Sequence, residues 1–154
     1  MPETHEHAVK RGKTSRKAGT EFERKVRANL EKQGWIVCKW SNNIDMGFRP
    51  NEPSVVTHRP AKLIPAKHTY NPFRRSMTAG HGFPDFIAFK PLMEKTTIQL
   101  VESKMTGKLD REEKDKIEWI IQNLGIPVII ASKGEKRGQI IYTEFQLKKQ
   151  EVKT

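Results

Sequence analysis

The sequence predicts an α/β domain with one central mixed sheet flanked by helices. Two observations lead to this prediction. Segments whose apolar residues recur at helical spacing end at a glycine, and short aromatic or β-branched runs of strand length follow them. The chain has 154 residues, which is the size of one ordinary domain and is enough to bury a core without disulfide bonds.

The N-terminal segment, residues 1–18, is basic and contains almost no apolar residue. Its five Lys and Arg residues include Lys10 and Arg11. A segment of this composition cannot bury enough apolar surface to fold, so we expect a disordered basic arm. Such an arm is either a solvated tail or a non-specific tether for phosphate groups.

The first regular elements are a helix and a strand. Phe22, Val26 and Leu30 recur every four residues, which predicts an amphipathic helix from Thr20 onward. Gly34 is placed to end this helix, because glycine adopts the left-handed conformation at a helix C-terminus without strain. The aromatic and β-branched run that follows predicts a strand over residues 35–40.

Residues 41–82 form a proline-rich insertion without a sustained period. Five of the nine prolines lie here, and six Lys and Arg oppose two acidic residues, so the charge is 6 − 2 = +4. We expect a long inserted loop, with room for short strands at 54–57 or 62–64. Loops longer than roughly 15 residues are uncommon in compact domains unless they have a function, so this insertion is a candidate functional surface.

The second half of the chain returns to regular patterns. Asp110 and Glu113 have the spacing of a capping box, with Asp in place of the usual Ser or Thr, and they predict the start of a helix. The expected elements are strands at 85–89 and 97–103, the helix from Asp110 to Gly125, strands at 127–131 and 138–144, and a polar tail at 146–154.

The composition indicates a polyanionic partner. Lys and Arg number 29 against 18 Asp and Glu, which gives a net charge of +11. No apolar run approaches the roughly 18 to 20 residues that a spanning helix needs, so we expect nucleic acid rather than membrane. The single cysteine excludes a disulfide framework and suits the reducing cytoplasm, where we expect the protein to be located.

Asp85, Glu102 and Lys104 are the candidate catalytic residues. Side chains two apart on a strand share a face, so Glu102 and Lys104 are expected to project together, and Asp85 opens the neighbouring strand. Two close carboxylates repel each other until a proton or a divalent cation relieves the repulsion. Mg²⁺ suits such oxygen ligands and can generate a hydroxide for attack on a phosphodiester, with Lys104 orienting the water.

A simpler interpretation is also open, because this pattern of residues is loose. Asp85 can be a turn residue after Pro84, and Glu102 and Lys104 can be the polar end of a half-buried strand. The pattern alone does not decide between the two interpretations.

The order of these motifs resembles the PD-(D/E)xK nuclease superfamily and, within it, the archaeal Holliday-junction resolvases. Residues 19–26 resemble the first-helix motif of that group, and Pro84-Asp85 with Glu102-Ser-Lys104 match its signature. The segments 35–38, 125–131 and 138–142 are similar to strands of the family. Gly82-Phe-Pro-Asp85 also resembles the virus-type replication-repair nucleases. The likeness covers residues 19–40 and 83–145.

The resemblance implies a restriction-endonuclease-like core and a Mg²⁺-dependent endonuclease that cuts branched or duplex DNA, with Mn²⁺ able to replace Mg²⁺. It implies that Asp85 and Glu102 hold the metal ion and that Glu23 on the first helix assists as a ligand or through a bridging water. It also implies a homodimer, because a four-way junction offers two symmetric cleavage points. The insertion at 41–82 departs from the family, whose members have a short loop there, and leaves the substrate assignment open.

Two alternatives remain: a less structure-specific DNA or RNA nuclease of the same fold, and a non-catalytic nucleic-acid-binding module. In the endonuclease, the basic and aromatic residues outside the core are expected to contact nucleic acid through phosphate pairing and stacking. These expected contacts are Lys10, Arg11, Arg59, Lys67, Tyr70, Phe73, Arg74 and Arg75.

Overall fold

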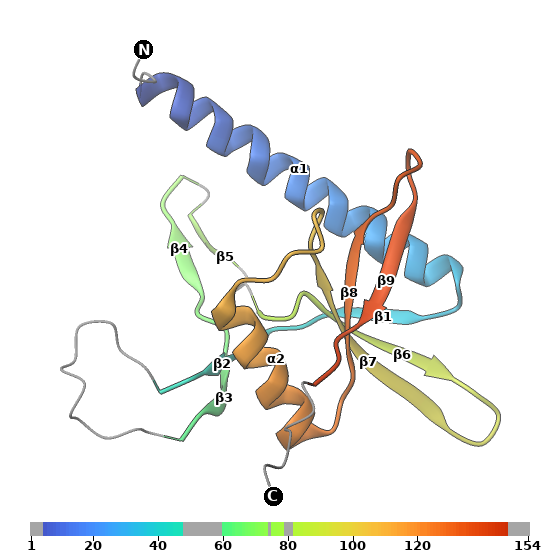
Figure 1. The fold of residues 1–154 in the computed structure, drawn as a ribbon. Coiled ribbons are helices and arrows are strands. Elements are labelled where there is room, and N and C mark those ends of the chain that lie inside the picture. Colours follow the sequence, from blue (N-terminus) through green and yellow to red (C-terminus); the bar gives the residue numbers. More distant parts are fainter. Residues whose placement is uncertain (1–4, 48–59, 74, 79–81, 148–154) are drawn as a thin grey trace, which may run out of the picture.

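The chain folds around a five-stranded sheet with one helix on each face (Figure 1). The computed structural model describes residues 5–47, 60–73, 75–78 and 82–147, with side chains from Arg11 onward. The elements of this core are α1 (His5–Lys32), β1 (Ile36–Lys39), β6 (Phe86–Pro91), β7 (Thr96–Ser103), α2 (Arg111–Leu124), β8 (Val128–Lys133) and β9 (Ile140–Glu144).

The sheet is mixed, and its strands follow the order β1-β6-β7-β8-β9. The pairs β1–β6, β6–β7 and β8–β9 are antiparallel, whereas β7 and β8 are parallel and are connected through α2. Because β6 runs against both of its neighbours, the start of β6 lies beside the ends of β1 and β7. The register places Phe86 opposite both Lys39 and Val101.

The helix α1 covers one face of the sheet through the stripe predicted from the sequence. Phe22, Val26 and Leu30 are buried in one cluster with residues of β1, β6, β7 and β8. The helix ends at Gly34 (φ +85°) as expected, and the amide of Trp35 donates to the carbonyl of Leu30 over 3.1 Å. This Schellman-type closure uses carbonyls that the helix leaves without partners.

The start of α1 differs from the prediction. The helix begins at His5, so the expectation of a disordered arm over residues 1–18 is wrong from residue 5 onward, and residues 1–4 lie outside the described part. Residues 11–17 are exposed on this extension. Its formation is explained by propagation, since each residue added to an existing helix gains a hydrogen bond without a new nucleation step.

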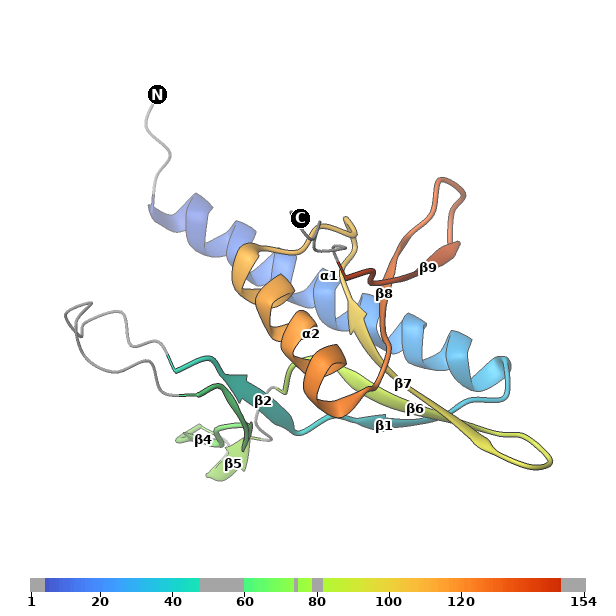
Figure 2. The ribbon, with the colours of Figure 1, turned by 60° about the horizontal axis from the view of Figure 1, so that its bottom comes forward.

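The helix α2 covers the other face. Ile117 and Ile120 are fully buried against Leu100, Val128 and Ile130 of the sheet. Asp110 and Glu113 form the predicted capping box, and Gly125 ends the helix in the left-handed conformation (φ +65°). Figure 2 shows α1 and α2 on opposite sides of the strands.

The insertion does not form the long loop expected over 41–82. Its described residues form two short antiparallel hairpins, the first of β2 (Asn42–Asp45) and β3 (Lys62–Pro65) and the second of β4 (Thr69–Asn71) and β5 (Ser76–Thr78). Ile44 anchors the first hairpin in the α2-side cluster. The possible strand at 62–64 is therefore confirmed within β3, and the one at 54–57 lies outside the described residues.

None of the helices in the described ranges is long and apolar enough to cross a membrane.

Candidate functional site

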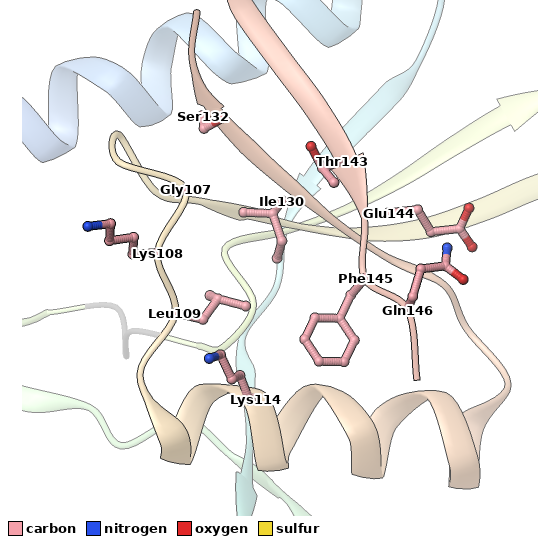
Figure 3. A pocket seen from close by; sticks show the side chains of 10 residues that line it. All are labelled: Gly107, Lys108, Leu109, Lys114, Ile130, Ser132, Thr143, Glu144, Phe145 and Gln146. Atoms are coloured by element: carbon pink, nitrogen blue, oxygen red, sulfur yellow. The ribbon is translucent and has the colours of Figure 1, made fainter. Parts of the chain in front are cut away.

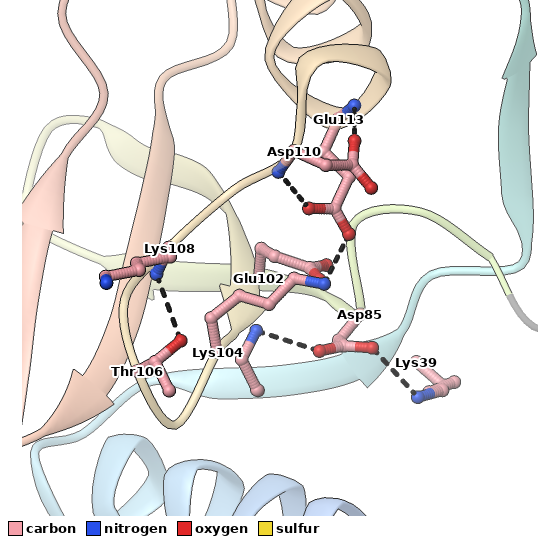
Figure 4. Close-up of polar contacts among 9 residues, drawn as sticks. Lys39, Asp85, Glu102, Lys104, Thr106, Lys108, Asp110 and Glu113 are labelled. Atoms are coloured by element: carbon pink, nitrogen blue, oxygen red, sulfur yellow. Dashed lines mark hydrogen bonds and ion pairs between the residues drawn. The ribbon is translucent and has the colours of Figure 1, made fainter.

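The candidate site lies at one end of the strands, where β1 and β7 end and β6 begins (Figure 4). We call this end of the strands the sheet edge. Asp85 precedes β6, Glu102 and Ser103 end β7, and Lys39 ends β1. Antiparallel pairing of three neighbouring strands therefore brings together residues that are far apart in the sequence. We call Glu23, Asp85 and Glu102 with the ammonium groups of Lys39 and Lys104 the acidic centre.

The approach to Asp85 is fixed by a close backbone contact. The amide of Phe83 donates to the carbonyl of Asn42 over 2.8 Å, and the amide of Trp40 donates to the carbonyl of Asp85 over 3.0 Å. A Cβ atom at Gly82 would collide with the carbonyl oxygens of Trp40 and Asn42. Glycine at position 82 thus allows the chain to return from the insertion directly against the end of β1.

Asp85 is oriented from both of its neighbouring strands. Its Oδ2 accepts a hydrogen bond from the backbone amide of Ser103 over 2.8 Å, and its Oδ1 lies 3.7 Å from Lys39 Nζ. Lys39 also donates to Glu23 Oε2 over 3.0 Å, so one ammonium group links the first helix to Asp85. Burial, together with the nearby carboxylate of Glu23, raises the pKa of Asp85 despite the hydrogen bond from Ser103.

Glu102 is the buried acid of the site. Its residue exposure is only 5%, and Lys104 Nζ lies 3.5 Å from its Oε1. Burial, and secondarily the charge of Asp85, raises the pKa of Glu102 to about 8. A carboxyl group with this pKa holds a proton at neutral pH until a cation replaces that proton.

Lys104 is held between Glu102 and the first turn of α2. Its ammonium group donates to Oε1 of Glu113, while Oε2 of the same carboxylate accepts from the amide of Asp110 over 2.9 Å. Burial opposes the charge of Lys104, but the hydrogen bond from its ammonium to Glu113 and the charge of Glu102 outweigh this effect and raise its pKa. The helix cap therefore also fixes the position of the candidate catalytic lysine.

The oxygen donors of the acidic centre fit a hard divalent cation. No group of three or more His, Cys, Asp or Glu side chains is close enough to form a metal site within the described ranges. Mg²⁺ is commonly held by only one or two carboxylates and keeps several waters, so a pair such as Asp85 and Glu102 matches the number of carboxylates that this ion uses. Burial is the largest cause of the raised pKa of each acid, and the neighbouring ammonium groups only partly offset it.

Three of the four residues predicted to be catalytic, Asp85, Glu102 and Lys104, lie at this edge, and Glu23 is connected to them through Lys39. Sequence reasoning missed Lys39 and the second role of Glu113. A signal for Lys39 existed, because it lies two residues after the buried Val37 and so faces the same helix. Glu113 was assigned to the capping box alone.

The predicted nucleic-acid contacts are dispersed over two elements. Tyr70 and Phe73 are exposed on the β4–β5 hairpin, Phe73 almost completely at 97%. Arg75 follows in the same hairpin with a positive φ of 47°, and Lys67 precedes it on the surface. Of the remaining predicted residues, Arg11 is exposed on α1, only the backbone of Lys10 is described, and Arg59 and Arg74 lie outside the described residues.

A cavity of about 680 Å³ opens beside the site but does not contain it (Figure 3). It lies between the loop that carries Lys108 and Leu109, the first turns of α2 and the end of β9 at Phe145. Neither Asp85, Glu102 nor Lys104 lines it. The candidate site is therefore the side-chain cluster where β1 and β7 end, and not this cavity.

No protein family, no curated protein and no solved structure matches the chain.

Proposed function

We propose that the protein is a metal-dependent endonuclease that hydrolyses phosphodiesters of DNA, with branched or Holliday-junction DNA as the leading substrate. The observation that carries the proposal is the buried Glu102 beside Asp85 and Lys104 at one sheet edge, in a chain with a net charge of +11. A buried acidic centre in a basic chain fits a site that binds a cation and a polyanion together.

Each residue of the acidic centre has a role in this proposal. Asp85 and Glu102 hold Mg²⁺, or Mn²⁺ in its place, and the ion supplies Lewis-acid polarisation of the phosphodiester and a water of lowered pKa. The amide of Ser103 keeps Asp85 oriented. Lys104 positions the attacking water and neutralises charge on the phosphate. Glu113 holds the ammonium group of Lys104 in place for this role. Glu23 assists from α1.

We also propose that the chain has a restriction-endonuclease-like fold. A five-stranded mixed sheet with a helix on each face is compatible with the restriction-endonuclease-like core that the sequence resemblance implies. The β2–β3 and β4–β5 hairpins are additions to that core. We propose that the β4–β5 hairpin contacts the DNA, with Phe73 and Tyr70 available for stacking and Arg75 for a phosphate.

The proposal also includes a homodimer in the cytoplasm. Support for dimerisation comes from an apolar strip on the α2 side of the sheet, beyond the helix itself. Ile36 and Ile98 both pair with Phe89, so their side chains share one face, and they are 56% and 39% exposed. Apolar side chains that share an exposed sheet face favour burial against another surface.

Substitution of Asp85 by Asn tests the proposed chemistry. We expect cleavage of a four-way junction in Mg²⁺ to fall on the order of 10³-fold, because the amide cannot compensate a cation as the carboxylate does. Binding of the same junction in EDTA is expected to persist. Cleavage is followed on gels with four-way junction, flap, linear duplex and single strand in parallel, which also ranks the substrates.

The matched control is Asp115→Asn, which makes the same change at an exposed position of α2. It is expected to cleave at the rate of the unsubstituted chain. Retention of activity by Asp85→Asn would exclude the proposed role. Cleavage of linear and branched substrates at equal rates would favour the less structure-specific nuclease.

One observation favours the second candidate function, a non-catalytic nucleic-acid-binding module. Lys39 Nζ lies 3.0 Å from Glu23 and 3.7 Å from Asp85, so the chain itself supplies a cation at these two acids. Under this alternative the cluster is a structural ion-pair network. Absence of cleavage of any DNA or RNA in Mg²⁺ or Mn²⁺, with binding intact, would establish it.

A further inference from the structure

A second charged site lies beside the acidic centre, in the turn between β8 and β9. A cavity of about 330 Å³ is formed there by residues 133–140 of the turn and by Phe22 and Lys25 of α1. Its charged residues are Lys25, Lys133, Lys136, Arg137 and Glu135, so the cavity carries 4 − 1 = +3. We call it the basic turn cavity.

The four cations of this cavity have no acidic partner in the described part of the chain. No ion pair among the described residues joins any of them to a carboxylate, although Lys39, Lys104 and Lys116 each form at least one elsewhere. Cations gathered at one cavity repel each other, and an anion that binds between them relieves this repulsion. The cavity therefore has the charge and the opening of a site for an external anion.

The backbone gives this cavity a defined shape. Gln139 accepts from the amide of Lys136 through its side chain, and its carbonyl accepts from the amide of Gly134 over 2.9 Å. A Cβ at Gly134 would collide with the Gln139 side chain, and Gly138 has a positive φ of 81°. Two glycines thus permit a compact turn between β8 and β9, in which Lys136 and Arg137 are exposed and line the cavity.

The turn and the acidic centre belong to the same edge of the sheet. The strands β7 and β8 are parallel, and both end at this edge. The amide of Lys104 donates to Ala131 over 2.8 Å, and the amide of Lys133 donates to Met105 over 3.1 Å. Hydrogen bonds therefore join Lys104 and Met105 to β8, the strand that leads into the basic turn cavity.

The helix α1 also connects the acidic centre to the basic turn cavity. Glu23 contacts Lys39 in the acidic centre, whereas its neighbours Phe22 and Lys25 line the basic turn cavity. The β4–β5 hairpin and the β8–β9 turn lie on opposite flanks of this edge (Figure 1 and Figure 2). A polyanion that crosses the acidic centre would meet cations on both flanks.

We propose that the basic turn cavity binds a backbone phosphate of the nucleic acid on the side of the acidic centre opposite the β4–β5 hairpin. The inference deepens the proposed function and rests on its nucleic-acid substrate. It assigns Lys25, Lys133, Lys136 and Arg137 to the substrate, none of which was identified from the sequence. It requires a substrate that extends beyond the cut position on both sides.

The test compares two double variants with the same loss of charge. The first, Lys136→Ala with Arg137→Ala, removes two cations from the cavity. The control, Lys32→Ala with Lys95→Ala, removes two exposed cations at the opposite edge of the sheet, from the last turn of α1 and the β6–β7 turn. Binding of a fluorescein-labelled four-way junction is measured in EDTA between about 50 and about 200 mM salt.

The cavity variant is expected to bind several-fold more weakly and to lose up to about 1 unit of slope in log K against log salt, since each phosphate contact contributes about 0.9. The control is expected to keep most of its slope. Equal losses in the two variants would overturn the inference, since they would reflect net charge alone. A loss confined to binding of phosphatidylserine vesicles would overturn it as well.

The outcomes separate this inference from the proposed function, because binding is measured without metal. A chain that shows the expected difference between variants but never cleaves would refute the endonuclease and keep the phosphate site. A chain that cleaves normally and binds equally well in both variants would keep the endonuclease and refute the phosphate site.

Discussion

The acidic centre and the basic turn cavity occupy the same sheet edge and differ in how their charges are compensated. In the acidic centre, Lys39 lies beside Glu23 and Asp85, and Lys104 lies beside Glu102. In the basic turn cavity, no described carboxylate pairs with the cations. The acidic centre compensates part of its charge internally, whereas the cations of the basic turn cavity have no described carboxylate as a partner.

This difference separates two kinds of binding. Under the proposed function, a metal ion that binds the acidic centre must compete there with protons and with the ammonium groups of Lys39 and Lys104. A cavity with uncompensated cations binds anions without displacing anything. The comparison therefore predicts that metal affinity is modest and pH-dependent, whereas attraction for the polyanion depends on salt.

Among the effects that bear on this difference between the two regions, the largest concerns Lys104. Under the proposed function, its replacement by Ala is expected to reduce turnover in Mg²⁺ by at least about 100-fold, because the charged donor proposed to act on the reacting phosphate is lost. Metal binding, followed by Mn²⁺ electron paramagnetic resonance, is expected to persist because both acids remain.

Lys108→Ala is the matched control, since Lys108 is exposed in the same loop and its described contacts do not include the acidic centre. Turnover of this control is expected to stay unchanged. Full activity of Lys104→Ala would show that Lys104 serves only to compensate Glu102 and Glu113.

The next effect is on stability and comes from the desolvation of Glu102. Its pKa is raised from 4.5 to about 8 in the folded chain, so the folded state binds more protons than the unfolded state between these values. The free energy of unfolding contributed by this group therefore falls as the pH rises from about 5 to about 8. Glu102→Gln is expected to remove this loss and to be more stable than the unsubstituted chain by a few kcal/mol at pH 9.

Urea unfolding in EDTA over this pH range measures the effect, and Glu94→Gln gives the same change at an exposed turn. A stability difference between Glu102→Gln and the unsubstituted chain that does not grow with pH would contradict the prediction. Glu102 would then be ionised in the folded chain at neutral pH, and the acidic centre would be more fully compensated than the comparison implies.

The parts that sequence predicts well are those fixed by local interactions. Gly34 and Gly125 end their helices as expected, and Asp110 and Glu113 form the expected capping box, because each motif is closed within a few residues. Strands of the core were also located to within a few residues. Their apolar runs are long enough to distinguish them from loops.

The parts that sequence missed depend on contacts between distant segments. The hairpins of the insertion have strands of three or four residues, which are too short to show a period, and the first of them packs on the α2-side cluster through the buried Ile44. Lys39 and Glu23 are 16 residues apart, and their contact depends on how α1 lies on β1. The basic turn cavity is formed by α1 and the β8–β9 turn together, so the sequence of neither segment alone predicts it.

The smallest expected effect tests the internal compensation directly. Lys39→Met removes an ammonium group that lies 3.7 Å from Asp85 Oδ1 and 3.0 Å from Glu23 Oε2, and it keeps most of the aliphatic side chain. At this separation a unit charge contributes between about 1 and about 4 kcal/mol, and the 40% exposure of the Lys39 side chain favours the lower end. We therefore expect Mn²⁺ to bind about tenfold more tightly, since 1.4 kcal/mol corresponds to a factor of ten.

Titration calorimetry with Mn²⁺ at pH 8 measures this change, and Lys95→Met at the opposite sheet edge is the control for loss of one charge. Equal gains in both variants would assign the effect to net charge, because long-range attraction does not depend on which lysine is removed. Weaker binding by Lys39→Met would mean that Lys39 orients Asp85 and Glu23 for the ion rather than competing with it. In that case the acidic centre would depend on an external cation in the same way as the basic turn cavity depends on an external anion under the proposal. The two regions would then differ only in the sign of their charge.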